Sequence, residues 1–226
     1  MKRRDFLKSA TATGAGLLIL PKTMLAGAGA PSNKLNIALI GTWGRGSAHF
    51  NAISSENVVA LCDVNEKHLA FGAQKFPGAK QYVDWRKCLE QKDIEAVVCC
   101  TADHTHAVAA LTAMKMGKHV LCEKPIAITT DEVDQMEAAC KKAGVKFMLA
   151  WCMRQNVYHK KMRELVQAGA LGKMVMGRAQ LTCWYPPIPG AWRQDPKTGG
   201  GGALVDMATH LYDLLVHFAG PVRRVV

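Results

Sequence analysis

The chain has 226 residues, 49% of them hydrophobic and 21% charged, so it can bury a core and is not a disordered polypeptide. Its formal charge of +11 does not indicate nucleic-acid binding, because the basic residues beyond the N-terminal segment are scattered and form no recognisable nucleic-acid motif. We expect no nucleic-acid partner, and no later apolar run reaches the roughly 18 residues of a membrane span.

Residues 1–28 have the layout of a secretory signal, with a charged start, an apolar stretch over 15–20 and the small-residue exit Ala26-Gly27-Ala28. The run from Arg3 to Lys8, RRDFLK, resembles a twin-arginine export signal. The resemblance implies a bacterial protein that folds in the cytoplasm, crosses through the twin-arginine translocase and acts in the periplasm or outside the cell. The alternative is a basic amphipathic helix.

Short apolar runs alternate with helix-like segments from residue 35 to residue 151, which predicts an α/β fold with a doubly wound parallel sheet. The expected strands are 35–40, 58–62, 96–101, 119–122 and 146–151, and the expected helices are 105–116 and 130–143. Ligands of such sheets bind at the carboxyl ends of the strands. The eight cysteines form no C-x-x-C pair, and most lie in apolar runs, so we expect them in the core.

A glycine-rich loop follows the first expected strand and opens a helix, with the sequence Gly41-Thr42-Trp43-Gly44-Arg45-Gly46. In the dinucleotide pattern G-x-G-x-x-G, Trp43 stands where the second glycine lets the backbone approach the pyrophosphate. Gly44, one position on, can serve instead. The tight turn and the helix start would present backbone N–H groups to a phosphate. The loop predicts a dinucleotide site, and an ordinary glycine turn is the alternative.

Asp63 ends the second expected strand, 22 residues after Gly41. An acidic side chain there can accept hydrogen bonds from the adenosine ribose and repel a 2′-phosphate, which favours NAD over NADP. Arg45 could offset this preference by meeting that phosphate, so NADP stays possible. Asp63 could also cap the helix that follows it.

Beyond Trp151 the pattern changes to a helix over 158–168, a strand-like stretch over 174–184 and a helix over 203–219. We expect a second unit of the α+β kind to begin at residue 153. So few elements cannot cover a sheet face, so we expect this unit to be incomplete and the chain to be a fragment or a truncated product.

The last expected helix carries Asp206, His210, Asp213 and His217 at spacings of four, three and four, which places them on one stripe. An imidazole with a carboxylate one turn away can act as a general base. His210 is therefore the candidate base, and Asp206 would orient it or bind substrate. A histidine on the helix surface is the alternative. Nothing else completes a metal site, so we expect no metal.

The segment from Ala113 to Pro125, AMKMGKHVLCEKP, closely resembles the A-x-x-x-G-K-H-V-x-x-E-K-P signature of the Gfo/Idh/MocA superfamily of oxidoreductases. Residues 101–106 and 192–213 resemble two other segments of this superfamily. The resemblance covers 34–226 and implies a Rossmann domain for NAD or NADP over 34–152, followed by an incomplete substrate domain over 153–226. It also implies a homo-oligomer when full length.

Besides the glycine loop and Asp63, the resemblance implies cofactor-binding roles for five further residues, namely Thr101, His106, Glu123, Lys124 and Pro125. It implies a sugar pocket lined by Arg154, Trp192 and Arg193. Lys124 also makes chemical sense by itself, because a lysine at the carboxyl edge of the sheet can stabilise the negative charge that develops on a reacting hydroxyl. A surface lysine in a turn is the alternative.

These features predict an oxidoreductase that transfers hydride between a nicotinamide cofactor and a sugar, cyclitol or related polyol. The superfamily resemblance leaves a second activity open, that of a glycosidase which oxidises the sugar, eliminates the glycoside and reduces the product with the same NAD. A non-catalytic protein that binds sugar or nucleotide is the third possibility.

Overall fold

The computed structural model describes residues 34–189, 191–195, 197, 199 and 201–225. The expected export signal at 1–28 lies outside these residues. Across the described part of the chain, no helix combines the length and the apolar character needed to cross a lipid bilayer.

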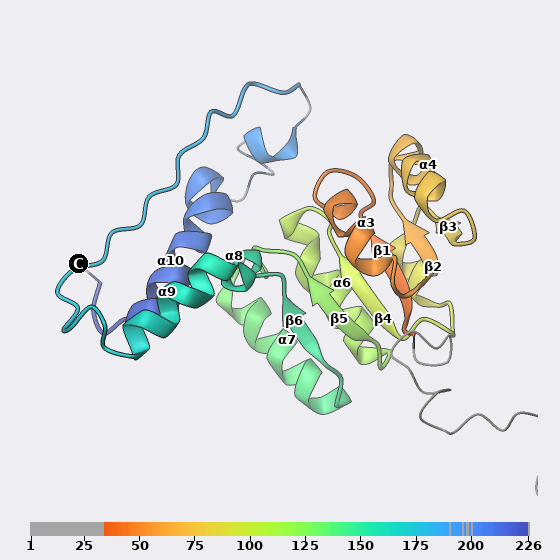
Figure 1. Ribbon diagram of the computed structural model, residues 1–226. Coiled ribbons are helices and arrows are strands. Elements are labelled where there is room, and N and C mark those ends of the chain that lie inside the picture. The colour runs from red at the N-terminus through yellow and green to blue at the C-terminus, as the bar shows by residue number, and fades with distance from the viewer. Residues whose placement is uncertain (1–33, 190, 196, 198, 200, 226) are drawn as a thin grey trace, which may run out of the picture. The chain divides into compact units, whose positions relative to one another are not determined.

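Six parallel strands form one sheet in the order β3-β2-β1-β4-β5-β6 (Figure 1). The strands are β1 (Asn36–Ile40), β2 (Asn57–Cys62), β3 (Lys80–Tyr82), β4 (Ala96–Cys99), β5 (His119–Cys122) and β6 (Phe147–Leu149). The central strands are apolar beyond their first residues because both faces of the sheet are covered. The strand order reverses between β1 and β4, which is where such sheets bind ligands. The predicted Rossmann-type α/β fold is confirmed.

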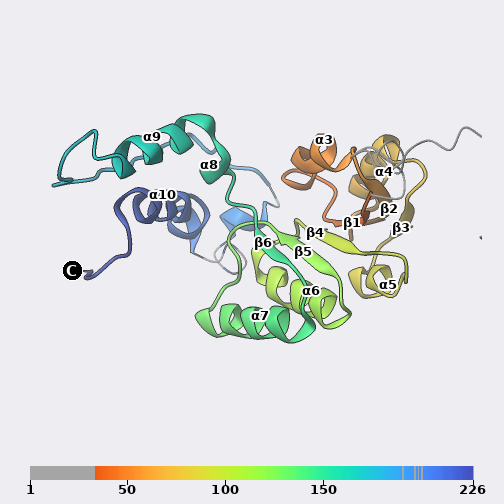
Figure 2. The same ribbon diagram turned by 60° about the horizontal axis from the view of Figure 1, so that its bottom comes forward.

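Helices cover both faces of the sheet, with α5, α6 and α7 on one side and α3 and α4 on the other (Figure 2). Their bounds are α3 (Phe50–Ile53), α4 (Glu66–Lys75), α5 (Trp85–Leu89), α6 (Asp103–Lys115) and α7 (Thr130–Ala143). Each face has its own core. Met114 and Met136 are fully buried on the first, and Phe50 and Leu69 pack on the second.

The helix ends follow from capping chemistry. Thr129 and Glu132 form a capping box at the start of α7, and Gly144 ends that helix in the left-handed conformation. Asn65 caps α4 by accepting a hydrogen bond from the N–H of Lys67. The alternative of a capping role for Asp63 on this helix is therefore wrong.

After the sheet the chain forms α8 (Cys152–Gln155), α9 (Val157–Gln167), the 3-10 turn η3 (Trp192–Gln194), the π-helical turn η4 (Leu204–Ala208) and α10 (Thr209–Ala219). The strand expected over 174–184 is wrong, because these residues adopt no regular structure. A strand needs a neighbour for its N–H and C=O groups, and no described strand pairs with this stretch. The expected helix over 203–219 is present but begins as a π-turn, a feature common at functional sites.

The cysteines divide into two groups. Five of them lie in the core as expected, namely Cys62, Cys88, Cys99, Cys100 and Cys122. Cys140 is half-buried, whereas Cys152 and Cys183 are exposed and the expectation fails for them. The sequence pattern did not distinguish these two from the core cysteines, because each has apolar neighbours. Cys152 lies at the start of α8, and Cys183 lies in irregular chain.

Candidate active site

The glycine loop is tight where Gly41 and Gly46 meet. Gly41 has φ of +87°, and a Cβ atom there would lie 2.5 Å from the carbonyl oxygen of Cys100. A Cβ atom on Gly46 would lie 1.9 Å from the carbonyl oxygen of Gly41. Neither position can carry a side chain, so the loop packs its own backbone against the end of β4. Gly44, with φ of +57°, faces open space.

Trp43 fits at the position of the missing second glycine because its side chain turns onto α4. The indole stacks on His68 with ring centroids 5.2 Å apart and meets Phe71 edge-on at 4.8 Å. The ring therefore leaves the inner side of the loop to backbone atoms and to Gly44.

Asp63 joins the glycine loop to the turn that follows β2. Its Oδ2 accepts hydrogen bonds from the N–H of Thr42 at 2.9 Å and from the Thr42 hydroxyl at 3.2 Å, and its Oδ1 accepts from the N–H of Asn65 at 3.0 Å. His68 Nδ1 lies 3.7 Å from Oδ1. The carboxylate is thus held at the carboxyl end of β2 with acceptor capacity to spare, since two oxygens offer about four lone-pair sites.

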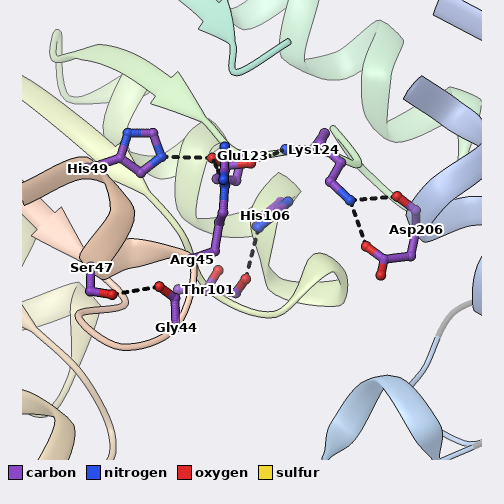
Figure 3. Close-up of polar contacts among 9 residues, drawn as sticks. All are labelled: Gly44, Arg45, Ser47, His49, Thr101, His106, Glu123, Lys124 and Asp206. Carbon is purple, nitrogen blue, oxygen red and sulfur yellow. Dashed lines mark hydrogen bonds and ion pairs between the residues drawn. The ribbon is translucent and has the colours of Figure 1, made fainter. Parts of the chain in front are cut away.

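Directly after β5, the buried carboxylate of Glu123 contacts the glycine loop, the helix that follows the loop and the backbone of Lys124 (Figure 3). Arg45 Nε and His49 Nε2 each lie 2.7 Å from Oε1, and the N–H of Lys124 donates to Oε2 at 3.2 Å. Burial alone would raise the pKa of Glu123, but the hydrogen bonds from His49 and Arg45 outweigh it and lower the pKa to about 2. The carboxylate is therefore ionised at every physiological pH.

A pocket of about 250 Å³ lies beside this cluster, at the carboxyl ends of β4 and β5. It brings together ten of the residues expected from the sequence, namely Arg45, Thr101, His106, Glu123, Lys124, Pro125, Trp192, Arg193, Asp206 and His210. His106 is buried and links two of the segments that carry them, because its ring nitrogens lie 2.7 Å from the carbonyl oxygen of Pro125 and 3.0 Å from that of Thr101.

Lys124 reaches across the pocket to the π-turn. Its Nζ lies 2.5 Å from the carbonyl oxygen of Asp206 and 2.6 Å from Oδ1 of the same residue (Figure 3). Arg193 Nε approaches the other carboxylate oxygen of Asp206 at 3.6 Å. An ammonium group has three N–H donors, so these contacts leave Lys124 one donor for a ligand in the pocket.

His210 lies one turn beyond Asp206, and its ring meets that of Trp151 edge-on at 5.9 Å. Its Nδ1 atom is buried and has no hydrogen-bond partner among the described residues. Burial lowers the pKa of His210, and the charges of Lys124 and Arg45 lower it further. The imidazole is consequently held in the neutral form, which is the form that can accept a proton.

Some expected residues lie elsewhere. Arg154 is not brought to the pocket, because its guanidinium is paired with the buried carboxylate of Asp213, with Nε 2.8 Å from Oδ2. It lines a separate basic groove with Lys160 and His217. Asp63 and the glycines lie along the switch point and do not line the pocket.

The sequence analysis missed five residues at or beside the pocket, namely His49, Cys100, Asp103, Cys152 and Tyr185. Asp103 and Cys152 share one signal, since each follows the carboxyl end of a strand, which is the edge that carries the site. No sequence pattern indicated His49, which is the last residue of the short 3-10 helix η2 (Gly46–His49), directly before α3. Tyr185 lies in irregular chain, where spacing predicts nothing.

A parallel sheet with a glycine loop at its switch point and an acidic residue after β2 defines a dinucleotide-binding protein of the Rossmann class. Two family profiles match the chain. The profile described as the oxidoreductase family with an NAD-binding Rossmann fold covers residues 35–151, and the profile of the GFO/IDH/MocA C-terminal domain covers 159–226. The chain belongs to the Gfo/Idh/MocA family of NAD-binding oxidoreductases.

Relatives of this chain include named sugar and cyclitol dehydrogenases. Levoglucosan dehydrogenase of Pseudarthrobacter phenanthrenivorans is 30% identical over 200 residues, which are 82% of this chain and 51% of the relative. Myo-inositol 2-dehydrogenase of Thermotoga maritima is 30% identical over 189 residues, 82% of this chain and 55% of the relative. The chain thus spans about half the length of the curated relatives it matches.

Among solved structures, the WlbA dehydrogenase from Bordetella pertussis, in complex with NADH and UDP-GlcNAcA, matches with a TM-score of 0.73 and 27% identity. The match covers 84% of this chain and 56% of that one. The family profile describes an NAD-binding Rossmann fold and this solved structure holds NADH, so the prediction of NAD from the glycine loop and Asp63 is confirmed.

Proposed function

We propose that the protein transfers hydride between NAD and a hydroxyl-bearing carbon of a sugar, cyclitol or related polyol. The observation that carries the proposal is the meeting of Lys124, Asp206 and His210 in one pocket at the carboxyl edge of the sheet, although Lys124 and Asp206 are 82 positions apart. The named dehydrogenases among the relatives support a carbohydrate substrate. Residues 34–152 would form the nucleotide domain and 153–226 the start of the substrate domain, as the two profile matches also suggest.

The residues present fit a dinucleotide. Gly44 offers open space beside the backbone, the charge of Arg45 suits a pyrophosphate, and Asp63 has acceptor capacity for a ribose. Thr101, His106 and Pro125 would line the nicotinamide half. When bound, NAD supplies the acceptor for the hydride that leaves the substrate carbon.

The side chains of the pocket would handle the hydroxyl of the substrate. Lys124 would donate its remaining N–H to the reacting oxygen and stabilise the negative charge that develops there. His210, which lines the pocket, would accept the hydroxyl proton on its neutral imidazole. Asp206 would hold Lys124 in place, while Trp192 and Arg193 would form the wall against which the sugar lies.

A substrate screen tests this proposal. The protein is incubated with NAD and a panel of sugars, cyclitols and glycosides, and NADH is followed by its absorbance. Net NADH formation with a free polyol supports the dehydrogenase. Release of an alcohol from a glycoside without net NADH would instead show the glycosidase cycle, and binding of sugar or NAD with neither reaction would show a non-catalytic protein.

Asp63→Asn should lower the ratio of NAD affinity to NADP affinity by about tenfold, or about 1.4 kcal/mol. The amide accepts ribose hydrogen bonds less well and no longer repels a 2′-phosphate. Calorimetric titration with both cofactors measures the ratio. Asp84→Asn is the control, because Asp84, like Asp63, lies just after a strand, whereas its side chain caps α5 and does not contact the glycine loop. An unchanged ratio in Asp63→Asn would show that Asp63 does not determine the preference for NAD over NADP.

We also propose that residues 1–28 direct the protein through the twin-arginine translocase to the periplasm or beyond. The support is the RRDFLK run with its apolar stretch and small-residue exit. Replacing Arg3 and Arg4 together by lysine should abolish most export in a bacterial host, as measured by cell fractionation, whereas Lys8→Arg should not. Equal export of both variants in a host without the translocase would refute the proposal.

A further inference from the structure

We infer that Glu123 is a positioning residue for the cofactor and does not touch it: braced by His49, Glu123 holds the Arg45 guanidinium against the pyrophosphate of the dinucleotide. The inference rests on the proposed function for its ligand. It changes the role expected of Glu123 and adds His49, which no sequence pattern indicated.

The carboxylate of Glu123 is buried and already has three donor partners within the protein, so it is not exposed to a ligand. Its side chain is 4% exposed, and Oε1 receives both Arg45 Nε and His49 Nε2 at 2.7 Å. The other oxygen accepts the N–H of Lys124 at 3.2 Å. One buried carboxylate thereby connects the glycine loop, the helix η2 and the end of β5 (Figure 3).

Unlike the buried carboxylate of Glu123, the side chain of Arg45 is partly exposed and lines the pocket. The Arg45 side chain is 42% exposed, and only its Nε atom is bonded to Glu123. Arg45 lines the pocket together with Cys152. A planar fork that is fixed at one edge presents its other N–H donors in a defined direction, which suits the bidentate binding of phosphate oxygens.

The sheet order decides which part of the dinucleotide Arg45 can meet. Arg45 reaches the end of β5, whereas Asp63 stands at the end of β2, three strand positions away in the order β2-β1-β4-β5. At about 4.8 Å per strand these ends are about 14 Å apart. The contact with Glu123 therefore directs Arg45 away from the end of β2, and this geometry does not support the expectation that Arg45 offsets the preference for NAD. Between the two ends lies the loop, where a pyrophosphate would bind.

The charges of the cluster are stable. Burial alone would lower the pKa of Arg45, but the hydrogen bond and the charge of Glu123 outweigh it and raise the pKa. The same pairing keeps the pKa of Glu123 far below neutrality. Both groups stay ionised, so the direction of the guanidinium is maintained by a charge-assisted bond at 2.7 Å.

A double-mutant cycle tests whether Glu123 acts through Arg45. Affinities for NAD and ADP-ribose are measured by calorimetry, without substrate, for Arg45→Ala, Glu123→Gln and the double variant. We expect losses of about thirtyfold for Arg45→Ala and about tenfold for Glu123→Gln, within the range of hydrogen bonds to charged groups. The double variant should bind no more weakly than Arg45→Ala, because the two residues form one pathway. AMP, which lacks the phosphate nearer nicotinamide, should lose much less affinity than ADP-ribose.

Matched variants separate positioning from folding. His49→Gln, whose amide can still donate to Glu123, should keep most of the NAD affinity that His49→Ala loses. Glu90→Gln, at an exposed carboxylate paired with Lys87, should change nothing. Melting temperatures identify variants that fail to fold, and affinities are compared only among folded ones.

Additive losses in the double variant, or an unchanged NAD affinity in Glu123→Gln, would overturn the inference. Equal losses of AMP and ADP-ribose would also contradict it, because Arg45 would then not recognise the pyrophosphate. These outcomes are distinct from failure of the proposed function, in which the unmodified protein binds neither NAD nor ADP-ribose.

Discussion

His210→Ala should lower kcat for polyol oxidation by about 10²- to 10⁴-fold, the usual contribution of a positioned general base. The affinity for NAD should change little, because the assigned role of His210 concerns the substrate proton. Stopped assays of NADH formation give kcat, and calorimetry gives the NAD affinity. The control is His217→Ala, which lies on the same helix α10 but lines the separate basic groove and should leave kcat nearly unchanged.

The pH profile gives a second measurement on the same residue. The pKa of His210 is lowered from its ordinary 6.5 by burial and by the charges of Lys124 and Arg45. A base works in its neutral form, so activity is present above this pKa and is lost as the pH falls through it. We expect the acid limb of kcat/KM below pH 6.5 and its disappearance in His210→Ala. Wild-type turnover in His210→Ala would exclude it as the base, and Asp206 would become the candidate.

Lys124→Ala should lower kcat by about 10²- to 10³-fold, as the loss of one donor to a developing oxyanion does in other enzymes. The NAD affinity should fall by much less, because the Nζ atom bonds Asp206 and faces the substrate side of the pocket. Single-turnover kinetics and calorimetry separate the two quantities.

An exposed lysine provides the comparison for this variant. Lys115→Ala, at the end of α6, removes a charge of the same kind from the surface and should leave kcat unchanged. If Lys124→Ala reduced NAD binding and turnover by the same factor, the lysine would serve the cofactor and not the developing charge. Asp206→Asn keeps an acceptor for Lys124 and should therefore retain more activity than Lys124→Ala.

Most strands could be predicted because their signal is local. Apart from Asn36, Asn57 and His119 at their first positions, strands β1, β2, β4 and β5 contain only apolar residues, as expected of strands buried on both faces. The three residues of β3, Lys-Gln-Tyr, carry no such signal, and pairing with β2 alone makes them a strand. The opposite error at 174–184 has the same cause, because β character in a sequence yields a strand only where a neighbour accepts the backbone hydrogen bonds.

The site divides in a similar way. Glycines 41 and 46 were predictable, because a backbone that approaches within van der Waals distance of another excludes every side chain. The pairing of Arg154 with Asp213 was not, since nothing in the spacing of 59 residues indicates it. A long cationic side chain has many carboxylates within reach, and the folded chain selects one of them.

The sequence by itself determined the sheet, the glycine loop at its switch point and the edge at which Asp63 and Lys124 would stand, because each of these follows from a contiguous pattern and from the direction of parallel strands. Only the tertiary structure decided the partner of each charged group. Glu123 was expected to face the cofactor, yet it is buried against Arg45 and His49, and Lys124 bonds Asp206 across the pocket. The reason is that burial of a carboxylate requires several donors at once, and such donors come from segments whose separation in the sequence carries no information about their distance in space.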